Sequence, residues 1–153
     1  MNEPIHFRPV TASDVPALAV MERLCFAQPW TENMLRGELA NPNADILLAL
    51  QDEALLGYIG IQCIAGECNI TNLAVHPDFR GRGLGLALLR IAQETALRCD
   101  SFALFLEVRE GNQSARGLYE KFGLRTVGRR KNYYSLPVED ALIMTKELQG
   151  ENI

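Results

Sequence analysis

The chain has 153 residues, of which 48% are hydrophobic and 22% charged, a composition typical of one globular domain spanning 1–153. Its net charge of −4 and scattered arginines argue against nucleic acid as a partner, and no apolar stretch approaches the roughly 20 residues that cross a membrane. The N-terminus has no basic segment followed by an apolar one, so we expect no signal peptide and a cytoplasmic protein.

The first part of the chain predicts a strand and two helices. Residues 5–10 alternate apolar and polar side chains, as a strand does, and a helix follows over 12–25. Four positions of this helix follow helical spacing, namely Val15, Leu18, Ala19 and Glu22. The segment 28–31 breaks the chain, and Thr31 can cap a second short helix that continues through Ala40.

The rest of the chain predicts further strands and two more helices. We expect strands at 45–50, 55–64, 68–75, 102–108, 124–130 and about 139–148, and helices at about 84–98 and from Asn112 or Ser114 to Gly123. One apolar stripe marks the first of these helices, formed by Leu84, Leu88, Ile91 and Ala92. The run 102–108 is typical of a strand buried on both faces, and an irregular loop containing 132–134 precedes the last strand. The order β-α-α-β-β-β-α-β-α-β-β predicts one mixed α/β domain.

The cysteines and histidines do not predict a metal site. The four cysteines are irregularly spaced, at Cys25, Cys63, Cys68 and Cys99, and only His6 and His76 could supply imidazole ligands. We therefore expect no metal, and small buried thiols kept reduced. His76 is interpreted as a turn residue.

The stretch HPDFRGRGLGLALLR, residues 76–90, predicts an anion site. A strand, a glycine-rich turn and a helix N-terminus bring free backbone N–H groups together, and the helix dipole adds positive charge. The P-loop pattern fails because no Lys-Ser or Lys-Thr is present, and the third glycine of the dinucleotide pattern would fall on Leu86 or Leu88. A nucleotide-binding regulator is therefore disfavoured, whereas a plain glycine turn remains an alternative.

The segment Arg80-x-x-Gly83-x-Gly85 fits [QR]xxGx[GA] and resembles the acyl-CoA pyrophosphate loop of the GCN5-related N-acetyltransferase (GNAT) superfamily. This resemblance implies a central mixed sheet of about seven strands flanked by about four helices, with acetyl-CoA as the co-substrate. It also implies that the strand before the loop pairs with the pantetheine arm in the manner of a neighbouring strand. The implied cofactor-binding residues are Leu73, Ala74, Val75, Arg80, Gly81, Arg82, Gly83, Leu84, Gly85, Leu86 and Asn112.

Glu107 is a carboxylate at the end of an apolar run, where a charge needs a partner or a chemical role. One interpretation is a salt bridge to Arg109 or another arginine. The other is a general base with a raised pKa. The residues alone leave both open.

Several strings resemble the RimI branch of the superfamily, the ribosomal-protein-alanine N-acetyltransferases. They are Leu106-Glu107-Val108-Arg109, Leu118-Tyr119-Glu120, Cys25-Phe26 with Pro29-Trp30, Arg129-Arg130, Asn132-Tyr133-Tyr134, Glu139-Asp140-Ala141 and Ile143-Met144. The resemblance implies that Glu107 accepts a proton, Tyr119 donates one and Asn112 contacts the cofactor. The loop 135–138 lacks the glycine expected for that branch.

Aromatic residues have two interpretations each. Tyr119 is either the proton donor or a core aromatic beside Leu118, and its hydroxyl needs a partner if buried. Trp30, Tyr133 and Tyr134 either wall a peptide slot over the thioester or pack within surface loops.

The pKa values of amines indicate which kind of amine is the nucleophile. An α-amino group of pKa near 8 is about 10% neutral at pH 7, whereas a lysine side chain of pKa near 10.4 is about 0.04% neutral. We therefore expect transfer to a protein N-terminus, and the RimI resemblance implies the alanine N-terminus of a small-subunit ribosomal protein, protein eighteen. The alternatives are acetylation of lysine side chains or small amines, and a catalytically silent acyl-CoA-sensing module.

Overall fold

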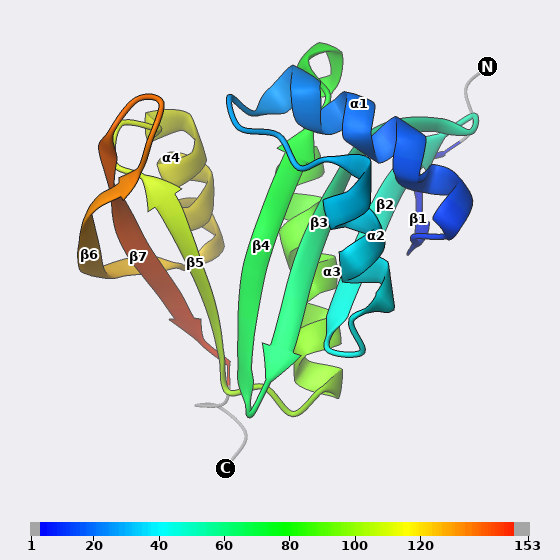
Figure 1. The fold of residues 1–153 in the computed structure, drawn as a ribbon. Coiled ribbons are helices and arrows are strands. Elements are labelled where there is room, and N and C mark those ends of the chain that lie inside the picture. The colour runs from blue at the N-terminus through cyan, green and yellow to red at the C-terminus, as the bar shows by residue number, and fades with distance from the viewer. Residues whose placement is uncertain (1–3, 149–153) are drawn as a thin grey trace.

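A computed structural model describes residues 4–148, which form a seven-stranded sheet with helices on both faces (Figure 1). The strands are β1 (His6–Pro9), β2 (Ala44–Gln51), β3 (Ala54–Ile64), β4 (Glu67–Val75), β5 (Ala103–Arg109), β6 (Arg125–Tyr134) and β7 (Glu139–Glu147). The helices are α1 (Val15–Cys25), α2 (Glu32–Ala40), α3 (Leu84–Arg98) and α4 (Gln113–Phe122), with short 3-10 turns at Ala12–Asp14 and Pro77–Phe79. The predicted mixed α/β class and element order are confirmed.

The sheet opens between two of its strands. Its order is β1-β2-β3-β4-β5-β7-β6, and β4 and β5 are the parallel pair. These two strands pair over 67–69 and 103–105, and from there they diverge, as Figure 1 shows. The carboxyl ends of β4 and β5 therefore border an opening, and the residues that follow each strand lie on its two sides.

Apolar faces of the helices hold the sheet from both sides. One buried cluster joins α1 and α2 to β2 and β3, and a second joins α3 to β3, β4, β5 and β7. The predicted stripe of α1 is confirmed, because Val15, Leu18, Ala19 and Glu22 are all buried. On α3 the buried residues are Leu84, Leu88, Leu89, Ala92 and Ala96, so Ile91 lies at the edge of the stripe and is half-buried.

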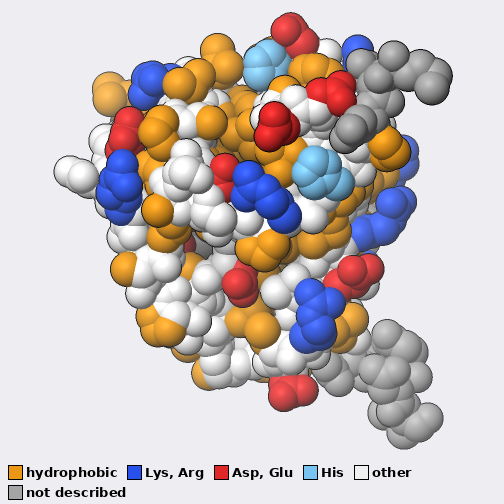
Figure 2. All heavy atoms as spheres, turned by 90° about the vertical axis from the view of Figure 1, so that its right-hand side faces the viewer, with side chains coloured by type: hydrophobic (Ala, Val, Ile, Leu, Met, Phe, Trp, Pro, Cys, Tyr) orange, Lys and Arg blue, Asp and Glu red, His pale blue; other side chains and the backbone are white. Residues whose placement is uncertain are grey.

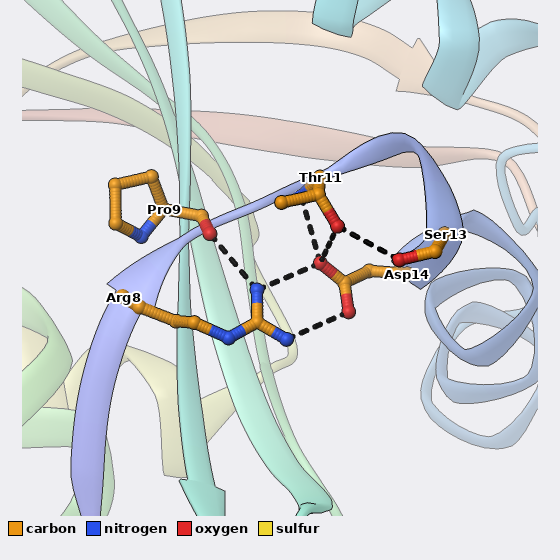
Figure 3. Close-up of polar contacts among 5 residues, drawn as sticks. All are labelled: Arg8, Pro9, Thr11, Ser13 and Asp14. Atoms are coloured by element: carbon orange, nitrogen blue, oxygen red, sulfur yellow. Dashed lines mark hydrogen bonds and ion pairs between the residues drawn. The ribbon is translucent and has the colours of Figure 1, made fainter.

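The 3-10 turn Ala12–Asp14, which leads into α1, is fixed by a cluster of polar contacts (Figure 3). The Asp14 carboxylate accepts from the Thr11 backbone N–H at 2.7 Å, and from Arg8 Nη1 and Nη2 at 2.8 and 2.9 Å. This capping box satisfies N–H groups that have no partner within the helix. At the second helix, the predicted cap is confirmed, since the Thr31 hydroxyl accepts from the Met34 N–H at 3.2 Å.

Two expectations differ from the structure. The segment 132–134 was expected to be irregular, yet β6 continues through it to Tyr134. A bulge makes this possible: Asn132 has a φ of 53°, and its N–H donates to Asp140 Oδ1 at 2.8 Å, which returns the strand to β7. The four cysteines were expected to be buried, but of these four only Cys68 is. Cys25 and Cys63 are half-buried, and Cys99 is exposed because it caps the solvent end of α3.

Charged side chains are interspersed on the side of the molecule where β1 lies, which is the right-hand side of Figure 1. Figure 2 shows lysine and arginine separated by acidic and apolar side chains there. Within 4–148, no helix is long and apolar enough to cross a membrane.

Candidate active site

A cavity of about 500 Å³ lies beside the glycine-rich turn, and we call it the glycine-loop cavity. Ten of the predicted cofactor-binding residues line it, namely Leu73, Ala74, Val75, Arg80, Gly81, Gly83, Leu84, Gly85, Leu86 and Asn112. Arg82 does not line it, since its guanidinium lies over the ring of Phe79, 5.1 Å from the centroid. The structure thus gathers the predicted set around one space, with Arg82 outside.

The backbone of β4 faces this space at alternate residues. The His76 N–H donates to the Leu56 carbonyl at 2.8 Å, so the polar groups of His76 and Ala74 point toward β3. Those of Leu73 and Val75 point the other way, into the opening between β4 and β5. The Val75 carbonyl accepts from Arg80 Nε at 3.1 Å, which ties the loop to the strand.

The three glycines of the loop serve two purposes. Gly81 and Gly83 have φ of 79° and 81°, and an added Cβ at either would meet no atom within 4 Å. They are required for the left-handed backbone that turns the N–H groups of the α3 N-terminus toward the cavity. Gly85 instead allows close packing, because its Cβ would lie 2.9 Å from Leu118 Cδ2 on α4.

A second cavity of about 300 Å³, the Glu107 cavity, continues the first between β4, β5 and the α1–α2 loop. Both cavities share a border of five residues, namely Phe26, Leu73, Asn112, Ala115 and Tyr119. The Asn112 side chain also caps α4, since its Oδ1 accepts from the Ala115 N–H at 3.1 Å. Tyr119 therefore lies at the junction of the two cavities.

Glu107 lies half-buried on the part of β5 that has separated from β4. Its Oε2 forms an ion pair with Arg130 Nε, and its Oε1 accepts from the Tyr133 hydroxyl at 3.2 Å. The expected arginine partner therefore exists, but it is Arg130 on β6. Arg109 pairs with Glu139 at 3.2 Å instead.

Tyr119 on α4 faces both cavities and packs against the core beneath α3. Burial raises the pKa of its hydroxyl to about 12. The phenol is therefore protonated at neutral pH, whichever of its two predicted roles it has.

Two of the three predicted aromatic wall residues line the Glu107 cavity. Trp30 and Tyr134 border it, whereas Tyr133 is 51% exposed and reaches it through the hydroxyl that contacts Glu107. Arg109 anchors the wall, because it lies 4.4 Å over the Tyr134 ring and donates to the Ser135 and Pro137 carbonyls at 3.1 and 3.0 Å. The loop 135–138 is thus held by Arg109 without the expected glycine.

Sequence reasoning missed Glu22, which also lines the Glu107 cavity and is 1% exposed. It accepts from the Trp30 N–H at 2.8 Å, from Asn72 Nδ2 at 3.1 Å and from the Tyr58 hydroxyl. Burial raises the pKa of this carboxyl, and the first two hydrogen bonds oppose the rise. Its signal in the sequence was a charged residue on the apolar stripe of α1, a position that rarely holds an unpaired charge.

The diverging strands thus border two joined cavities, one beside the glycine turn at a helix N-terminus and the other beside Glu107. The model of the Acetyltransferase (GNAT) family matches residues 15–124, and the chain belongs to this family. The superfamily recognised from the glycine turn is therefore confirmed.

Similar proteins and solved structures indicate which branch of the family this chain resembles. A Bacillus subtilis protein provisionally named a ribosomal protein bS18-alanine N-acetyltransferase is 42% identical over 138 residues, covering 90% of this chain and 91% of its own. The crystal structure of the Escherichia coli ribosomal-protein-alanine N-acetyltransferase is 29% identical, with a TM-score of 0.88, and the match covers 98% of this chain and 99% of that one. The Arabidopsis thaliana NAA60 complex with acetyl-CoA shares the fold at 19% identity, with a TM-score of 0.89 over 96% and 100% of the chains.

Proposed function

We propose that the protein transfers the acetyl group of acetyl-CoA to the α-amine of a protein N-terminus, in the cytoplasm. The observation that carries the proposal is the pair of cavities that meet at Tyr119, one beside the anion-binding turn and the other beside a carboxylate. The substrate we propose is the N-terminal alanine of ribosomal protein bS18, since that is what the relatives are named for.

Acetyl-CoA suits the residues of the glycine-loop cavity. The N–H groups at the start of α3 can hold the pyrophosphate, and the open space above Gly81 and Gly83 admits it. The Leu73 backbone can pair with the amides of the pantetheine arm, as an added strand would. When bound, acetyl-CoA supplies the acetyl group as a thioester.

Glu107 takes the proton that the amine loses when it becomes an amide. Each carboxylate oxygen has a second lone pair, so Glu107 can accept this proton, directly or through a water, while Arg130 and Tyr133 remain in contact. Those two contacts also fix the orientation of the carboxylate where it lines the Glu107 cavity. The nitrogen–carbon bond of the product forms as the carbon–sulfur bond breaks.

Tyr119 stabilises the departing sulfur by hydrogen bonding. A phenol of pKa about 12 is a weaker acid than a thiol, whose pKa is about 8.5. Complete proton transfer to the thiolate is therefore unfavourable, whereas a hydrogen bond from the hydroxyl is not. We assign Tyr119 the role of hydrogen-bond donor to the departing sulfur at the junction of the cavities.

The α-amine is favoured over lysine by the state of the nucleophile. At pH 7 the neutral fraction of an α-amine exceeds that of a lysine side chain by over two orders of magnitude, equivalent to about 3 kcal/mol. One partly exposed carboxylate suffices for such an amine. A lysine would require further stabilisation of its neutral form.

Release of CoA tests the proposal. The protein is mixed with acetyl-CoA and a peptide beginning with alanine and containing no lysine, and the free thiol is measured. We expect release with the free N-terminus and only the background rate with the same peptide blocked by a formyl group. Equal rates with both peptides would contradict the proposal.

Calorimetric titration with acetyl-CoA separates the remaining alternatives. Binding without CoA release, over a panel of N-terminal and lysine peptides, would indicate an acyl-CoA-sensing module. If acetyl-CoA does not bind at high micromolar concentration, both the transferase proposal and the acyl-CoA-sensing alternative are contradicted.

A further inference from the structure

Glu22 is a buried carboxylate that the proton transfer proposed above does not use. It is 1% exposed, on the inner face of α1, and it lies on the border of the Glu107 cavity. Its position there requires a reason, because an ionised carboxylate loses its hydration in such a place.

Three donors from three different elements converge on this carboxylate. They are the Trp30 backbone N–H of the α1–α2 loop, the Tyr58 hydroxyl of β3 and the Asn72 side-chain amide of β4. The contacts span 8, 36 and 50 residues of sequence. Because β3 and β4 are already paired with each other, the effect of Glu22 is to tie the α1–α2 loop to this pair of strands.

A carboxylate is the side chain that satisfies this arrangement. Ionised, it has acceptor sites only, and here all three neighbours donate. Glutamine would bring an amide N–H₂ into a ring of donors, although the Tyr58 hydroxyl could rotate to accept from it. Alanine would leave three donors without their acceptor.

The three contacts join the two walls of the candidate active site. Trp30 borders the Glu107 cavity, and Asn72 precedes Leu73, whose backbone faces the opening between β4 and β5. We propose that Glu22 is a positioning residue, which holds the Trp30 loop against β4 and so sets where the peptide amine lies relative to the acetyl group. This inference rests on the proposed function, but its structural part can be tested without it.

The test compares Glu22→Ala and Glu22→Gln with the control Glu38→Ala. Glu38 also receives an inter-element contact, since Gln62 Nε2 donates to both of its oxygens at 2.9 Å, yet it lines neither cavity. Two readouts are used: the Michaelis constants for peptide and for acetyl-CoA, and acrylamide quenching of tryptophan fluorescence. Trp30 is the only tryptophan of the chain, so the quenching reports on its loop.

We expect Glu22→Ala to lower kcat/KM for the peptide by about 10- to 100-fold, the range for a displaced reacting group. The Michaelis constant for acetyl-CoA should stay nearly unchanged, and Trp30 should become easier to quench. Glu22→Gln should recover most of both losses, and Glu38→Ala should show neither. If Glu22→Ala does not fold, Asn72→Ala, which removes one donor and keeps the carboxylate, should show the same pattern more weakly.

Two results would overturn the inference. The first is a Glu22→Ala protein with the quenching and peptide kinetics of the wild type. The second is a Glu22→Gln protein as inactive as Glu22→Ala but with wild-type quenching, which would assign Glu22 a proton-transfer role. If the wild type acetylates no N-terminus, the proposed function fails, and the quenching comparison by itself decides whether Glu22 holds the loop.

Discussion

Glu107 and Glu22 line the same cavity, but they differ in exposure and in the residues that contact their carboxylates. Glu107 is half-buried, and its contacts with Arg130 and Tyr133 are made by side chains that are themselves largely exposed. Glu22 is enclosed, and its three donors belong to the scaffold. An amine entering the cavity can therefore approach Glu107, whereas Glu22 is almost entirely shielded from anything that enters.

Replacing Glu107 by glutamine tests the base directly. Glutamine keeps the shape and loses the basicity, so we expect kcat to fall roughly 10²- to 10⁴-fold with little change in acetyl-CoA affinity. The loss should shrink above about pH 8, where the substrate amine is already neutral. The measurement is the pH dependence of kcat for wild type and variant.

Arg130→Gln provides the control, because it removes the same ion pair and keeps the carboxylate. It should cost far less activity than Glu107→Gln. If instead both variants keep wild-type kcat at pH 7 and melt a few degrees lower, Glu107 serves only as an ion-pair partner.

Tyr119→Phe should reduce kcat less than Glu107→Gln does. The leaving thiolate has a conjugate acid of pKa about 8.5 and departs with little assistance at neutral pH. A Tyr119→Phe loss as large as that of Glu107→Gln, measured in the same assay, would show that the hydroxyl also positions the thioester.

At the scale of elements, the start of the first helix should make stability depend on pH. Arg8 holds the pKa of Asp14 at about 2, below its ordinary value near 3.9. A depressed pKa contributes stability that is present above the ordinary value and is lost as the pH falls toward 2. Asp14→Asn keeps an acceptor and removes the charge, so we expect it to lower the free energy of unfolding at pH 7 by up to about 1 kcal/mol, the upper range for an ion pair of this kind.

The difference between wild type and Asp14→Asn should disappear between about pH 4 and pH 2. Urea unfolding at several pH values measures it. Asp78→Asn is a matched control, since that carboxylate is 82% exposed and should change stability by less than about 0.5 kcal/mol. A wild-type advantage that persists unchanged at pH 2 would contradict the assignment.

The glycine turn should act through its backbone. Gly83→Val forces a branched residue into a φ of 81° and should raise the Michaelis constant for acetyl-CoA steeply, because the N–H groups of the turn lose their direction. Arg82→Ala should do much less, since that side chain lies over Phe79 and outside the cavity. Gly37→Ala, at an open helical position, controls for loss of glycine alone.

Equal effects of Gly83→Val and Arg82→Ala would mean that side-chain charge, and not the amide cradle, holds the anion. A Gly37→Ala protein that loses acetyl-CoA affinity as Gly83→Val does would point to a general loss of stability instead.

Most elements followed from the sequence, since periodicity and caps are local properties. The stripe of α1 and the Thr31 cap are examples. The bulge that carries β6 through Asn132 was not predictable, because its partner, Asp140, lies across a turn. The choice of Arg130 over Arg109 for Glu107 likewise depends on which strand lies beside β5.

At the scale of the molecule, the site exists because the sheet opens. Residues 103–109 stay paired with β7 while β4 stays paired with β3, so the two halves of the sheet border a space that their own hydrogen bonds cannot close. From the sequence, only the resemblance of the motifs to the RimI branch predicted that Glu107, Asn112 and Tyr119 belong to one site. Glu22 was missed because its role depends on three elements meeting in space.

Acetyl-CoA should join these halves. We expect hydrogen exchange of the Leu73 and Val75 amides and of those of 84–86 to slow when it binds, while α2 is unaffected. At 100 times the dissociation constant, binding adds about 2.7 kcal/mol of stability. Unchanged exchange across the opening, at saturating acetyl-CoA, would contradict the proposed location.

The most direct test of the central claim locates the acetyl group on one peptide that offers both kinds of amine. A peptide that begins with alanine and contains one internal lysine is incubated with the protein and acetyl-CoA, and tandem mass spectrometry assigns the modified nitrogen. We predict a single acetyl group on the α-amine of the alanine, formed at pH 7 roughly 10²- to 10⁴-fold more slowly when Glu107→Gln replaces the wild type. Acetylation confined to the lysine side chain would contradict the claim.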